Sequence, residues 1–503
     1  MNTAYAQLWP RVGSKSSRSI GRYLVRLIRV LVAFVVLTLI AAACSSDDAV
    51  VPNPLPQFNP VSVSPDSIDP YAPVDVVPVA GLDRCEWSSS GSPTLWQTCE
   101  QTADAQHDQA VINRDFVAEN AVVEIRDDGD HLCFIDSDEI VTPAVPGDIP
   151  TDIGATLNGD VGDLPGGLSV YTVDDPIRAA DVLLAAGIPA SPRYVLMPSP
   201  RWKFGGGGAA IPGDGGIVDQ QGSLAATGDG VIVIIDTGAA GTEPSNLSEA
   251  IRGHGEFIAG IVRRLLPSGV SVSERSALED NGDASPVPTE HSTIKQIDDA
   301  LGQVAGSNSG GELSEGGVVN LSLGTYACRP AQVPLELAAR LGEIAKSNPD
   351  VVFVAAAGND SHIKGDPPFW PAGFTDTELL DGAMTAWTHL DNYPLFESAI
   401  SDLLEAQATA PIVVGVGAQV YDKSDPSSPT WLPAEFSNQV AATVWAPGAN
   451  IVSNYPDWGG FAQWDGTSFA APHVAALVAR CQDPFASQNY RDALASIIEN
   501  GSC

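Results

Sequence analysis

Apolar residues in the second half of the chain follow two periodicities. Continuous runs rich in Val and Ile, such as Val231–Ile235 and Val351–Ala357, are typical of strands buried on both faces of a parallel sheet. Between such runs, Thr293–Val304 and Leu335–Ser347 show apolar residues at helical spacing. Further strands are predicted at Gly316–Asn320, Pro411–Ala418 and Val444–Val452. The alternation predicts an α/β fold, a doubly wound and mainly parallel sheet with helices on both faces.

A smaller α+β pattern precedes this region. Ala121–Arg126 and Leu168–Val173 alternate apolar and polar residues as strands do, and Tyr194–Met197 predicts another strand. Asp175-Pro176 is a helix start, with Asp as N-cap and Pro in the first turn, and Gly187 is expected to end that helix.

Composition divides the chain into segments. Residues 44–84 are rich in Pro and predict an extended tether, and residues 201–230 include Gly205–Gly208 and predict a flexible linker that a protease could cut. Residues 85–200 between them form the α+β region, either an inhibitory prodomain or a permanent accessory domain. Residues 231–503 form the main domain.

Residues 1–43 have the anatomy of an export signal. A stretch without Asp or Glu carries basic residues up to Arg29, and the apolar run Val30–Ala43 is short for a membrane span. The small residues before Cys44 resemble a bacterial lipoprotein cleavage site with Cys44 as the lipidated residue, which we prefer to ordinary signal cleavage after Ala41-Ala42-Ala43. We therefore expect an exported protein, either a lipoprotein anchored in the cell-surface membrane or a secreted protein.

Charge and cysteine content narrow the possible functions. The chain has 62 acidic and 25 basic residues, a net charge of −37, which repels nucleic acid and argues against nucleic-acid binding. Of its seven Cys, those other than Cys44 are enough for three disulfides in an oxidising compartment, with a connectivity that spacing does not fix.

Candidate catalytic side chains occur where predicted elements end or begin. Asp236 ends the first buried strand, and His254 begins an amphipathic helix. Ser468 follows Gly466-Thr at the start of an apolar helix, where the helix dipole favours negative charge, and Pro472 is expected in the first turn of that helix. By itself Ser468 would more commonly be an N-cap.

Short motifs surround these residues in a fixed order. They are Ile-Ile-Asp236-Thr-Gly, His254-Gly-x-x-Ile-Ala-Gly, Asn320-Leu-Ser-Leu-Gly324, Ala-Ala-Gly358-Asn359-Asp, Phe436-Ser-Asn, Ala446-Pro-Gly448 and Gly466-Thr-Ser468-x-Ala-x-Pro-His. The motifs, and the order Asp, His, Ser, resemble the subtilase family of subtilisin-like serine proteases over about Gly228 to Cys503. One such motif is moderately specific, whereas all of them in order are very specific.

The resemblance implies a serine endopeptidase and a role for each matched residue. Ser468 would be the nucleophile, His254 the general base, and Asp236 the residue that orients His254. The Asn359 side chain and the Ser468 backbone N–H would form the oxyanion hole.

The resemblance also implies the partners. Protein or peptide substrates would pair as an added strand with Ser322, Leu323 and Gly324. No cofactor is required and no metal ligand is assigned, although the acidic turns at 127–130 and 280–283 have suitable oxygen atoms for a structural calcium ion. We expect a monomer that associates with the membrane only through its N-terminal lipid anchor.

Two departures from the family pattern stand out. Glu256-Phe257 replaces the commoner Thr-His, and residues 373–410 form an insertion with helices predicted at Glu378–Met384 and Tyr393–Ala408. We expect this insertion to be a surface elaboration, which could still border the substrate. The rival function is a catalytically silent subtilase-like surface binding protein, which the four intact catalytic positions argue against.

Overall fold

The computed structural model describes residues 123–127, 132–198, 211–212, 230–238, 253–266, 270–280, 283–284, 288–303, 311–359, 368–422, 430–455, 461–481 and 489–500. All of them belong to one compact unit, Pro56–Cys503. The predicted signal, the tether with Cys44 and most of the 201–230 linker lie outside the described residues, so the domain boundaries there stay predictions.

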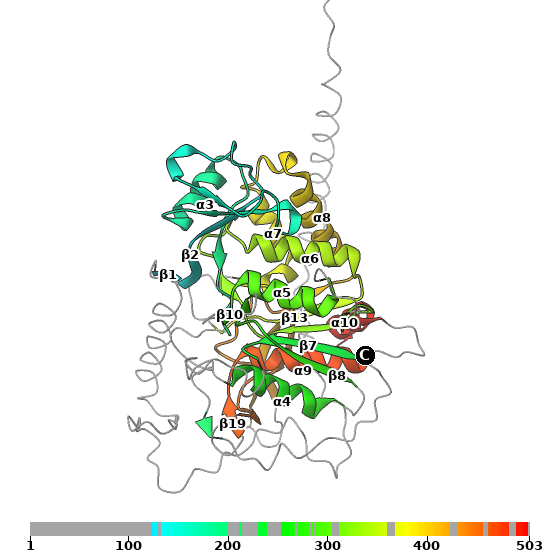
Figure 1. The fold of residues 1–503 in the computed structure, drawn as a ribbon. Coiled ribbons are helices and arrows are strands. Elements are labelled where there is room, and N and C mark those ends of the chain that lie inside the picture. The colour runs from blue at the N-terminus through cyan, green and yellow to red at the C-terminus, as the bar shows by residue number, and fades with distance from the viewer. Residues whose placement is uncertain are drawn as a thin grey trace, which may run out of the picture. The chain divides into compact units, whose positions relative to one another are not determined.

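A seven-stranded sheet runs through the second half of the chain (Figure 1). Its strands are β7 (Val231–Asp236), β8 (Ser271–Ser276), β11 (Gly317–Leu321), β13 (Val351–Ala356), β15 (Val413–Asp422), β16 (Thr430–Pro433) and β17 (Val444–Pro447). The order is β16-β15-β13-β11-β7-β8, with β17 also paired to β15, and every pairing except β15 with β16 is parallel. The predicted mainly parallel sheet is confirmed.

Helices cover both faces of this sheet (Figure 1). They are α5 (Glu290–Leu301) and α6 (Leu335–Ser347) on one face, and α4 (His254–Leu265), α9 (Thr467–Cys481) and α10 (Tyr490–Asn500) on the other. Neighbouring strand residues point to opposite faces, so Val233 joins the buried cluster under α5 and α6 while Ile232 and Ile234 join the cluster under α4 and α9. This double burial explains why the strands appear in the sequence as continuous apolar runs.

One predicted strand is in fact two. Val444–Val452 divides into β17 and β18 (Ile451–Asn454), because Asn450 has a positive φ of 59° that interrupts the extended chain. β18 pairs with β19 (Phe461–Trp464), which pairs in turn with β6 (Ile211–Pro212). The remaining short elements are β9 (Glu279–Asp280), β10 (Asp283–Ala284), β12 (Thr325–Tyr326), β14 (Phe369–Trp370), η4 (Ala372–Thr375) and η5 (Leu390–Asn392).

Residues 132–198, called here the N-terminal module, lie within residues 85–200, the region predicted to be α+β. Its elements are β2 (Leu132–Thr142), η1 (Thr151–Ile153), β3 (Thr156–Asn158), η2 (Pro165–Gly167), β4 (Ser169–Thr172), α3 (Pro176–Ala185) and β5 (Ser191–Tyr194), and β1 (Val123–Asp127) extends its antiparallel sheet. The start of α3 is as predicted, because the Asp175 side chain accepts the N–H of Arg178 at 3.0 Å.

The inserted helices α7 (Thr377–Met384) and α8 (Pro394–Thr409) are not a surface elaboration, and that expectation was wrong. Phe396 of α8 is fully buried in the core that α8 shares with α6. Gly187 of the N-terminal module accepts the N–H of His389 at 2.9 Å, and a Cβ at Gly187 would lie 2.0 Å from Oγ1 of Thr388. The inserted segment therefore forms part of the surface against which the N-terminal module packs. Sequence spacing does not reveal this long-range contact.

Two carboxylates are completely buried where the N-terminal module meets α5 and α6. Glu336 accepts hydrogen bonds from Arg193 at 3.3 Å and from His291 at 3.1 Å. Burial alone would raise the pKa of Glu336, but the charge of Arg193 and the hydrogen bonds from Arg193 and His291 outweigh it and lower the pKa. Glu290 accepts the backbone N–H of Tyr194 at 3.0 Å, and burial together with the charge of Glu336 raises the pKa of Glu290 to about 8.

This arrangement predicts a pH-dependent stability. The pKa of Glu290 rises from an ordinary 4.5 to about 8 on folding. Between these two pH values, Glu290 therefore carries a proton in the folded protein that it lacks in the unfolded chain. The free energy of unfolding should therefore fall as pH rises through this window, by up to about 1.4 kcal/mol per pH unit. Glu290→Gln should flatten this fall in urea unfolding followed by Trp fluorescence, whereas Glu378→Gln, at an exposed carboxylate, should keep it. An unchanged slope in Glu290→Gln would contradict the assignment.

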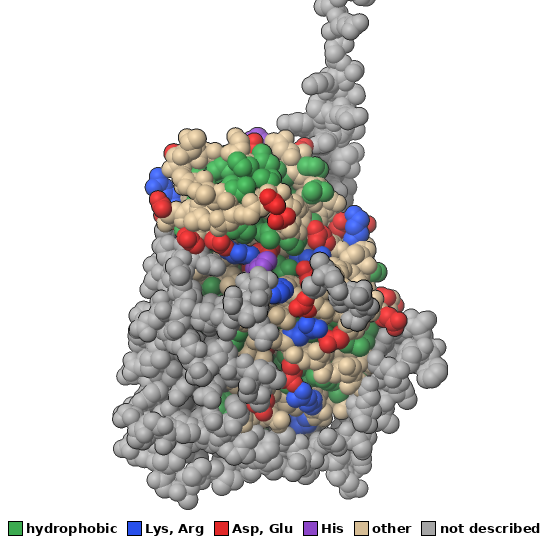
Figure 2. Space-filling model, in the orientation of Figure 1, with side chains coloured by type: hydrophobic (Ala, Val, Ile, Leu, Met, Phe, Trp, Pro, Cys, Tyr) green, Lys and Arg blue, Asp and Glu red, His purple; other side chains and the backbone are tan. Residues whose placement is uncertain are grey.

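The described surface mixes charges of both signs. Figure 2 shows Lys and Arg side chains interspersed with Asp and Glu on the face drawn there. In this part of the chain, no helix is long and apolar enough to cross a membrane.

Candidate active site

Polar residues meet at the carboxyl ends of the central parallel strands. Asp236 is the last residue of β7, Ser322 follows β11, and Asn359 lies beyond the end of β13. After β7 the chain forms β8 on one side of β7, and it then crosses over to form β11 on the other side. The strand order therefore changes direction at β7. Open α/β sheets bind their ligands at such a switch point.

Asp236 and His254 pair directly. His254 Nδ1 lies 2.7 Å from Asp236 Oδ1, and the two residues are 3% and 1% exposed. Thr237 links the two elements, since its N–H donates to Asp236 Oδ1 at 2.8 Å and its hydroxyl accepts the N–H of Gly255 at 3.0 Å. A Cβ at Gly255 would lie 2.5 Å from the Gly238 carbonyl oxygen, so this approach requires glycine. With Nδ1–H donating to the carboxylate, Nε2 of His254 remains as the basic nitrogen.

Asp236 Oδ2 is buried and has no hydrogen-bond partner among the residues described. Leaving a buried acceptor unpaired costs free energy. Other buried polar atoms of the described residues, such as Thr293 Oγ1, share this state, so it does not by itself identify a site.

Ser468 is held at the start of α9 by a reciprocal pair of hydrogen bonds. Its Oγ–H donates to the Ser322 carbonyl oxygen at 3.0 Å, and Ser322 Oγ–H donates to the Ser468 carbonyl oxygen at 2.7 Å. Asn320 Nδ2 donates to the Ser322 hydroxyl at 3.0 Å. All these residues are buried.

The first-turn position expected for Pro472 was wrong. Pro472 lies inside α9, four residues after Ser468. Proline has no N–H, so the Ser468 carbonyl lacks its usual helical donor. The Ser322 hydroxyl donates to the Ser468 carbonyl oxygen instead, at 2.7 Å. This hydrogen bond connects the start of α9 to the loop after β11.

His254 and Ser468 are neighbours but are not hydrogen-bonded to each other in the described structure. The His254 ring lies 5.4 Å from the ring of Phe469, the residue after Ser468, and 5.4 Å from the ring of Trp464. Phe257, which belongs to the Glu256-Phe257 departure from the family pattern, packs on both of those rings. A rotation of the Ser468 hydroxyl away from Ser322 would be needed for catalysis, and such contacts often form only with substrate bound.

Asn359 is oriented by Thr467. Its Oδ1 accepts both the N–H of Thr467 at 2.8 Å and the hydroxyl of Thr467 at 2.9 Å, and that hydroxyl accepts the N–H of Gly358 at 3.1 Å. These bonds fix which end of the amide is oxygen, so Nδ2 is directed away from Thr467. Nδ2 lies on the side of Gly466, where a Cβ would come within 3.3 Å of it.

The second histidine of the motifs has a structural role. His473 Nδ1 donates to the Phe469 carbonyl oxygen at 2.7 Å within α9. Burial lowers the pKa of His473 to about 3, so its imidazole stays neutral at ordinary pH. Of the two motif histidines, His254 is the one that pairs with a carboxylate.

Thr467 and Trp464 are parts of this site that were not predicted from the sequence. Thr467 belongs to a quoted motif, but its contact with Asn359 spans 108 positions. Trp464 carries no sequence signal that would place it against His254. Both contacts depend on the folded arrangement of distant segments.

A metal site finds no support in the described residues. No group of three or more His, Cys, Asp or Glu side chains there could hold a metal ion. The side chains of the two acidic turns proposed for calcium lie outside the described set, so that prediction stays untested.

Comparisons with known proteins agree with the motifs. The sequence model of the subtilase family matches residues 235–500, more than half of the chain. A subtilisin-like protease 1 from Trichophyton rubrum is 44% identical over 72 residues, which cover 14% of this chain and 13% of that protein. The corresponding protein from Trichophyton verrucosum is 43% identical over 72 residues, which cover 14% of this chain and 16% of that protein. The matched segment thus spans only a small part of these relatives.

The similar solved structures have lower sequence identity. Fervidolysin from Fervidobacterium pennivorans, a keratinolytic enzyme related to subtilisin, has 17% identity and a TM-score of 0.42, and the match covers 73% of this chain and 57% of that one. A cold-adapted subtilisin-like serine proteinase has 21% identity and a TM-score of 0.34, and the match covers 55% of this chain and 84% of that one. The family model carries the assignment: the chain belongs to the subtilase family.

Proposed function

We propose that this protein is a serine endopeptidase that hydrolyses protein or peptide substrates through Asp236, His254 and Ser468. The observation that carries the proposal is the buried His254–Asp236 pair, 2.7 Å apart, at the same edge of the sheet as the N-terminus of α9. Family membership supports the same conclusion.

In the proposed mechanism, Ser468 Oγ attacks the carbonyl carbon of the scissile peptide while His254 Nε2 takes its proton. Asp236 keeps Nδ1 protonated and stabilises the imidazolium that forms. The carbonyl oxygen, now negatively charged, accepts hydrogen bonds from Asn359 Nδ2 and the Ser468 N–H. His254 then protonates the leaving amine, and water hydrolyses the acyl-enzyme by the same route.

The proposal is tested by hydrolysis of a denatured protein and of a peptide library, with and without prior treatment with a fluorophosphonate. We expect cleavage that the fluorophosphonate abolishes, and the library also gives the P1 preference. A chain that cleaves nothing after its linker has been fully processed would support the rival, a silent surface binding protein.

Replacing Asn359 with Leu should lower kcat by about 10²–10³, a loss known from the corresponding donor in subtilisin itself. KM should change little, because the amide donates mainly to charge that develops in the transition state. Steady-state kinetics with one peptide substrate measures both constants. A large rise in KM with unchanged kcat would place Asn359 in ground-state binding instead.

Thr467 provides the matched test of orientation. Thr467→Val removes the hydroxyl that donates to Asn359, whereas Thr467→Ser retains it. We expect kcat to fall in the Val variant and to recover in the Ser variant. Equal losses in both would indicate a packing role for the Thr467 methyl group.

Export and anchoring through Cys44 belong to the same proposal. The disulfide between Cys133 and Cys328 supports an oxidising compartment. Mass spectrometry of the N-terminus tests the anchor, since a lipidated Cys44 and an unmodified N-terminus differ in mass.

A further inference from the structure

His254 has aromatic neighbours from two other elements of the fold. Trp464, the last residue of β19, makes a T-shaped contact with the imidazole, with ring centroids 5.4 Å apart and ring planes at 87°. Phe469 of α9 lies 5.4 Å from the imidazole with its plane tilted by 48°. Trp464 and Phe469 also contact each other, with centroids 5.1 Å apart. The imidazole is therefore packed against two rings that also support each other.

Phe257 extends this packing one turn further along α4. Residues three apart lie on the same face of a helix, so His254 and Phe257 have the same neighbours. The Phe257 ring makes a T-shaped contact with Trp464, at 5.6 Å and 88°, and lies 4.6 Å from the Phe469 ring. Phe257 is fully buried and Trp464 is 5% exposed. Trp464 thus packs on both aromatic side chains of this helix face.

Hydrogen bonds attach the β18–β19 pair, which carries Trp464, to α4. Ser453 Oγ of β18 donates to the Phe257 carbonyl oxygen at 2.6 Å. Arg264 Nη1 of α4 donates to the Val452 carbonyl oxygen of β18 at 2.7 Å. Strand β19 pairs in turn with β18. The backbone therefore fixes Trp464 against the helix that begins at His254.

The His254 imidazole needs such support. Among the described residues, its hydrogen bond is that of Nδ1 with Asp236 Oδ1, at 2.7 Å. One hydrogen bond fixes one atom of the ring and leaves the ring free to swing about that atom. Proton transfer requires Nε2 to come within about 2.6–3.2 Å of the Ser468 hydroxyl oxygen, so the direction of this swing matters. Close-packed rings restrict it.

We propose that Trp464 is a positioning residue, which holds the His254 imidazole so that Nε2 stays directed toward the start of α9, and that Phe257 acts through Trp464. The inference rests on the proposed function, because it takes His254 as the general base. An indole has no basic nitrogen, so Trp464 takes up no proton itself. The proposal also gives a role to Phe257, which departs from the family pattern.

Trp464→Leu should lower kcat by about 10², the loss that can follow a displacement of about 1 Å at a catalytic group. KM should change little, because Trp464 is only 5% exposed and offers little surface to a substrate. Trp464→Phe keeps an aromatic ring and should recover most of kcat. Steady-state kinetics with one peptide substrate measures both constants. A raised KM with unchanged kcat, or equal kcat in the Leu and Phe variants, would overturn the inference.

Trp387→Leu is the matched control for this change. Trp387 is 3% exposed and belongs to the apolar cluster under α5 and α6, whereas Trp464 belongs to the cluster under α4 and α9. Trp387→Leu should lose stability in urea unfolding and keep its kcat. A loss of kcat as large as that of Trp464→Leu would show that losing any buried indole lowers activity, and would contradict the positioning role.

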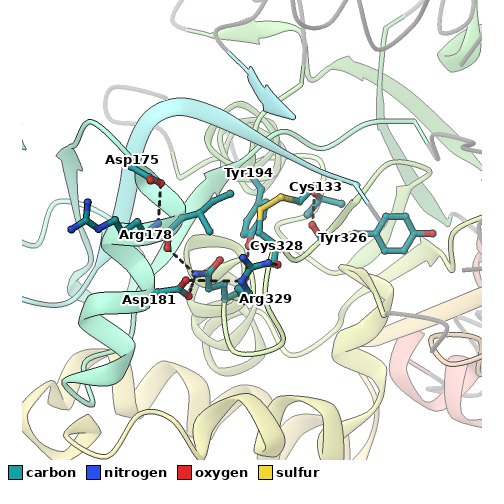
Figure 3. The surroundings of a disulfide bond; sticks show 11 residues. Cys133, Asp175, Arg178, Asp181, Tyr194, Tyr326, Cys328 and Arg329 are labelled. Atoms are coloured by element: carbon teal, nitrogen blue, oxygen red, sulfur yellow. Dashed lines mark hydrogen bonds and ion pairs between the residues drawn. A yellow bond between two sulfur atoms is a disulfide. The ribbon is translucent and has the colours of Figure 1, made fainter. Parts of the chain in front are cut away.

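Tyr194→Phe is a second control, for lost hydrogen bonds with the ring retained. Figure 3 shows Tyr194 beside the disulfide, where its hydroxyl donates to the Gln332 carbonyl oxygen at 2.5 Å and accepts the Cys328 N–H at 3.2 Å. This variant should lose stability and keep its kcat. A kcat that falls with stability in both controls would attribute the effect of Trp464→Leu to stability alone.

Phe257→Leu tests whether Phe257 acts through Trp464. By itself the change should lower kcat about fivefold, the effect of one edge-to-face contact. In Phe257→Leu/Trp464→Leu, kcat should equal that of Trp464→Leu, because the indole that Phe257 supports is already absent. Losses that multiply in the double variant would show that Phe257 acts independently of Trp464.

Fluorophosphonate labelling separates this inference from the proposed function. The probe reports the activation of Ser468 and requires no peptide substrate. We expect slower labelling in Trp464→Leu and the rate of the parent protein in Trp387→Leu. A parent protein that neither labels nor hydrolyses peptides contradicts the proposed endopeptidase. A parent protein that labels at Ser468, with the same rate in Trp464→Leu, contradicts only the positioning role of Trp464.

Discussion

Ser468→Ala should lower kcat by about 10⁶, the loss known for the nucleophile of subtilisin itself. The methyl side chain cannot form the acyl-enzyme, so His254 and Asp236 have no hydroxyl proton to move. The oxyanion donors would remain, and with them a residual acceleration of about 10³–10⁴ over the reaction in water. Hydrolysis of one peptide substrate, followed by mass spectrometry to reach low rates, measures this loss.

Ser292→Ala is the matched control for this change. Ser292 is also fully buried, but it caps α5, where its N–H and hydroxyl bond to Thr289. We expect this variant to lose about 1 kcal/mol of stability and to keep its kcat. Comparable hydrolysis by Ser468→Ala and the parent would show that another group carries the reaction.

Asp236→Asn should lower kcat by about 10⁴ through the wrong tautomer of His254. The amide NH₂ of the new Asn would donate to Nδ1, so the ring proton would move to Nε2. Nε2 could then no longer accept the proton of Ser468. Shape and packing stay almost unchanged, so substrate binding should be preserved and KM should change little.

Asp298→Asn tests whether losing any ion-paired carboxylate has the same effect. Asp298 pairs with Arg340 on the face of the sheet covered by α5 and α6, away from His254. This variant should lose stability in urea unfolding and keep its kcat. If Asp236→Asn lost no more activity than Asp298→Asn, the 2.7 Å pair with His254 would be structural only.

The sequence predicted the central sheet well because its strands are buried on both faces. Val231–Ile235 and Val351–Ala357 need no partner information to be identified as strands, since continuous β-branched runs suit little else. Leu335–Ser347 likewise matches α6 residue for residue. The position of Pro472 within its helix was predicted wrongly. The contact that compensates for its missing N–H comes from Ser322, 150 positions away in the chain.

The contacts of the N-terminal module with the rest of the domain were the least predictable part of the structure. Spacing among six cysteines does not select Cys133 with Cys328, and no local pattern joins Gly187 to Thr388. Met197 looked like the end of an ordinary strand, and only the fold brings it to Gly324. These contacts join segments more than a hundred residues apart, and their energy comes from burial that local sequence does not record.

The most direct test of the account is fluorophosphonate labelling of the processed wild-type protein, with the modified residue identified by peptide mass spectrometry. We expect a single modification at Ser468, slowed greatly in Asp236→Asn because the probe reacts only with an activated hydroxyl. No modification of Ser468, or modification at the same rate when Asp236 is replaced, would contradict it.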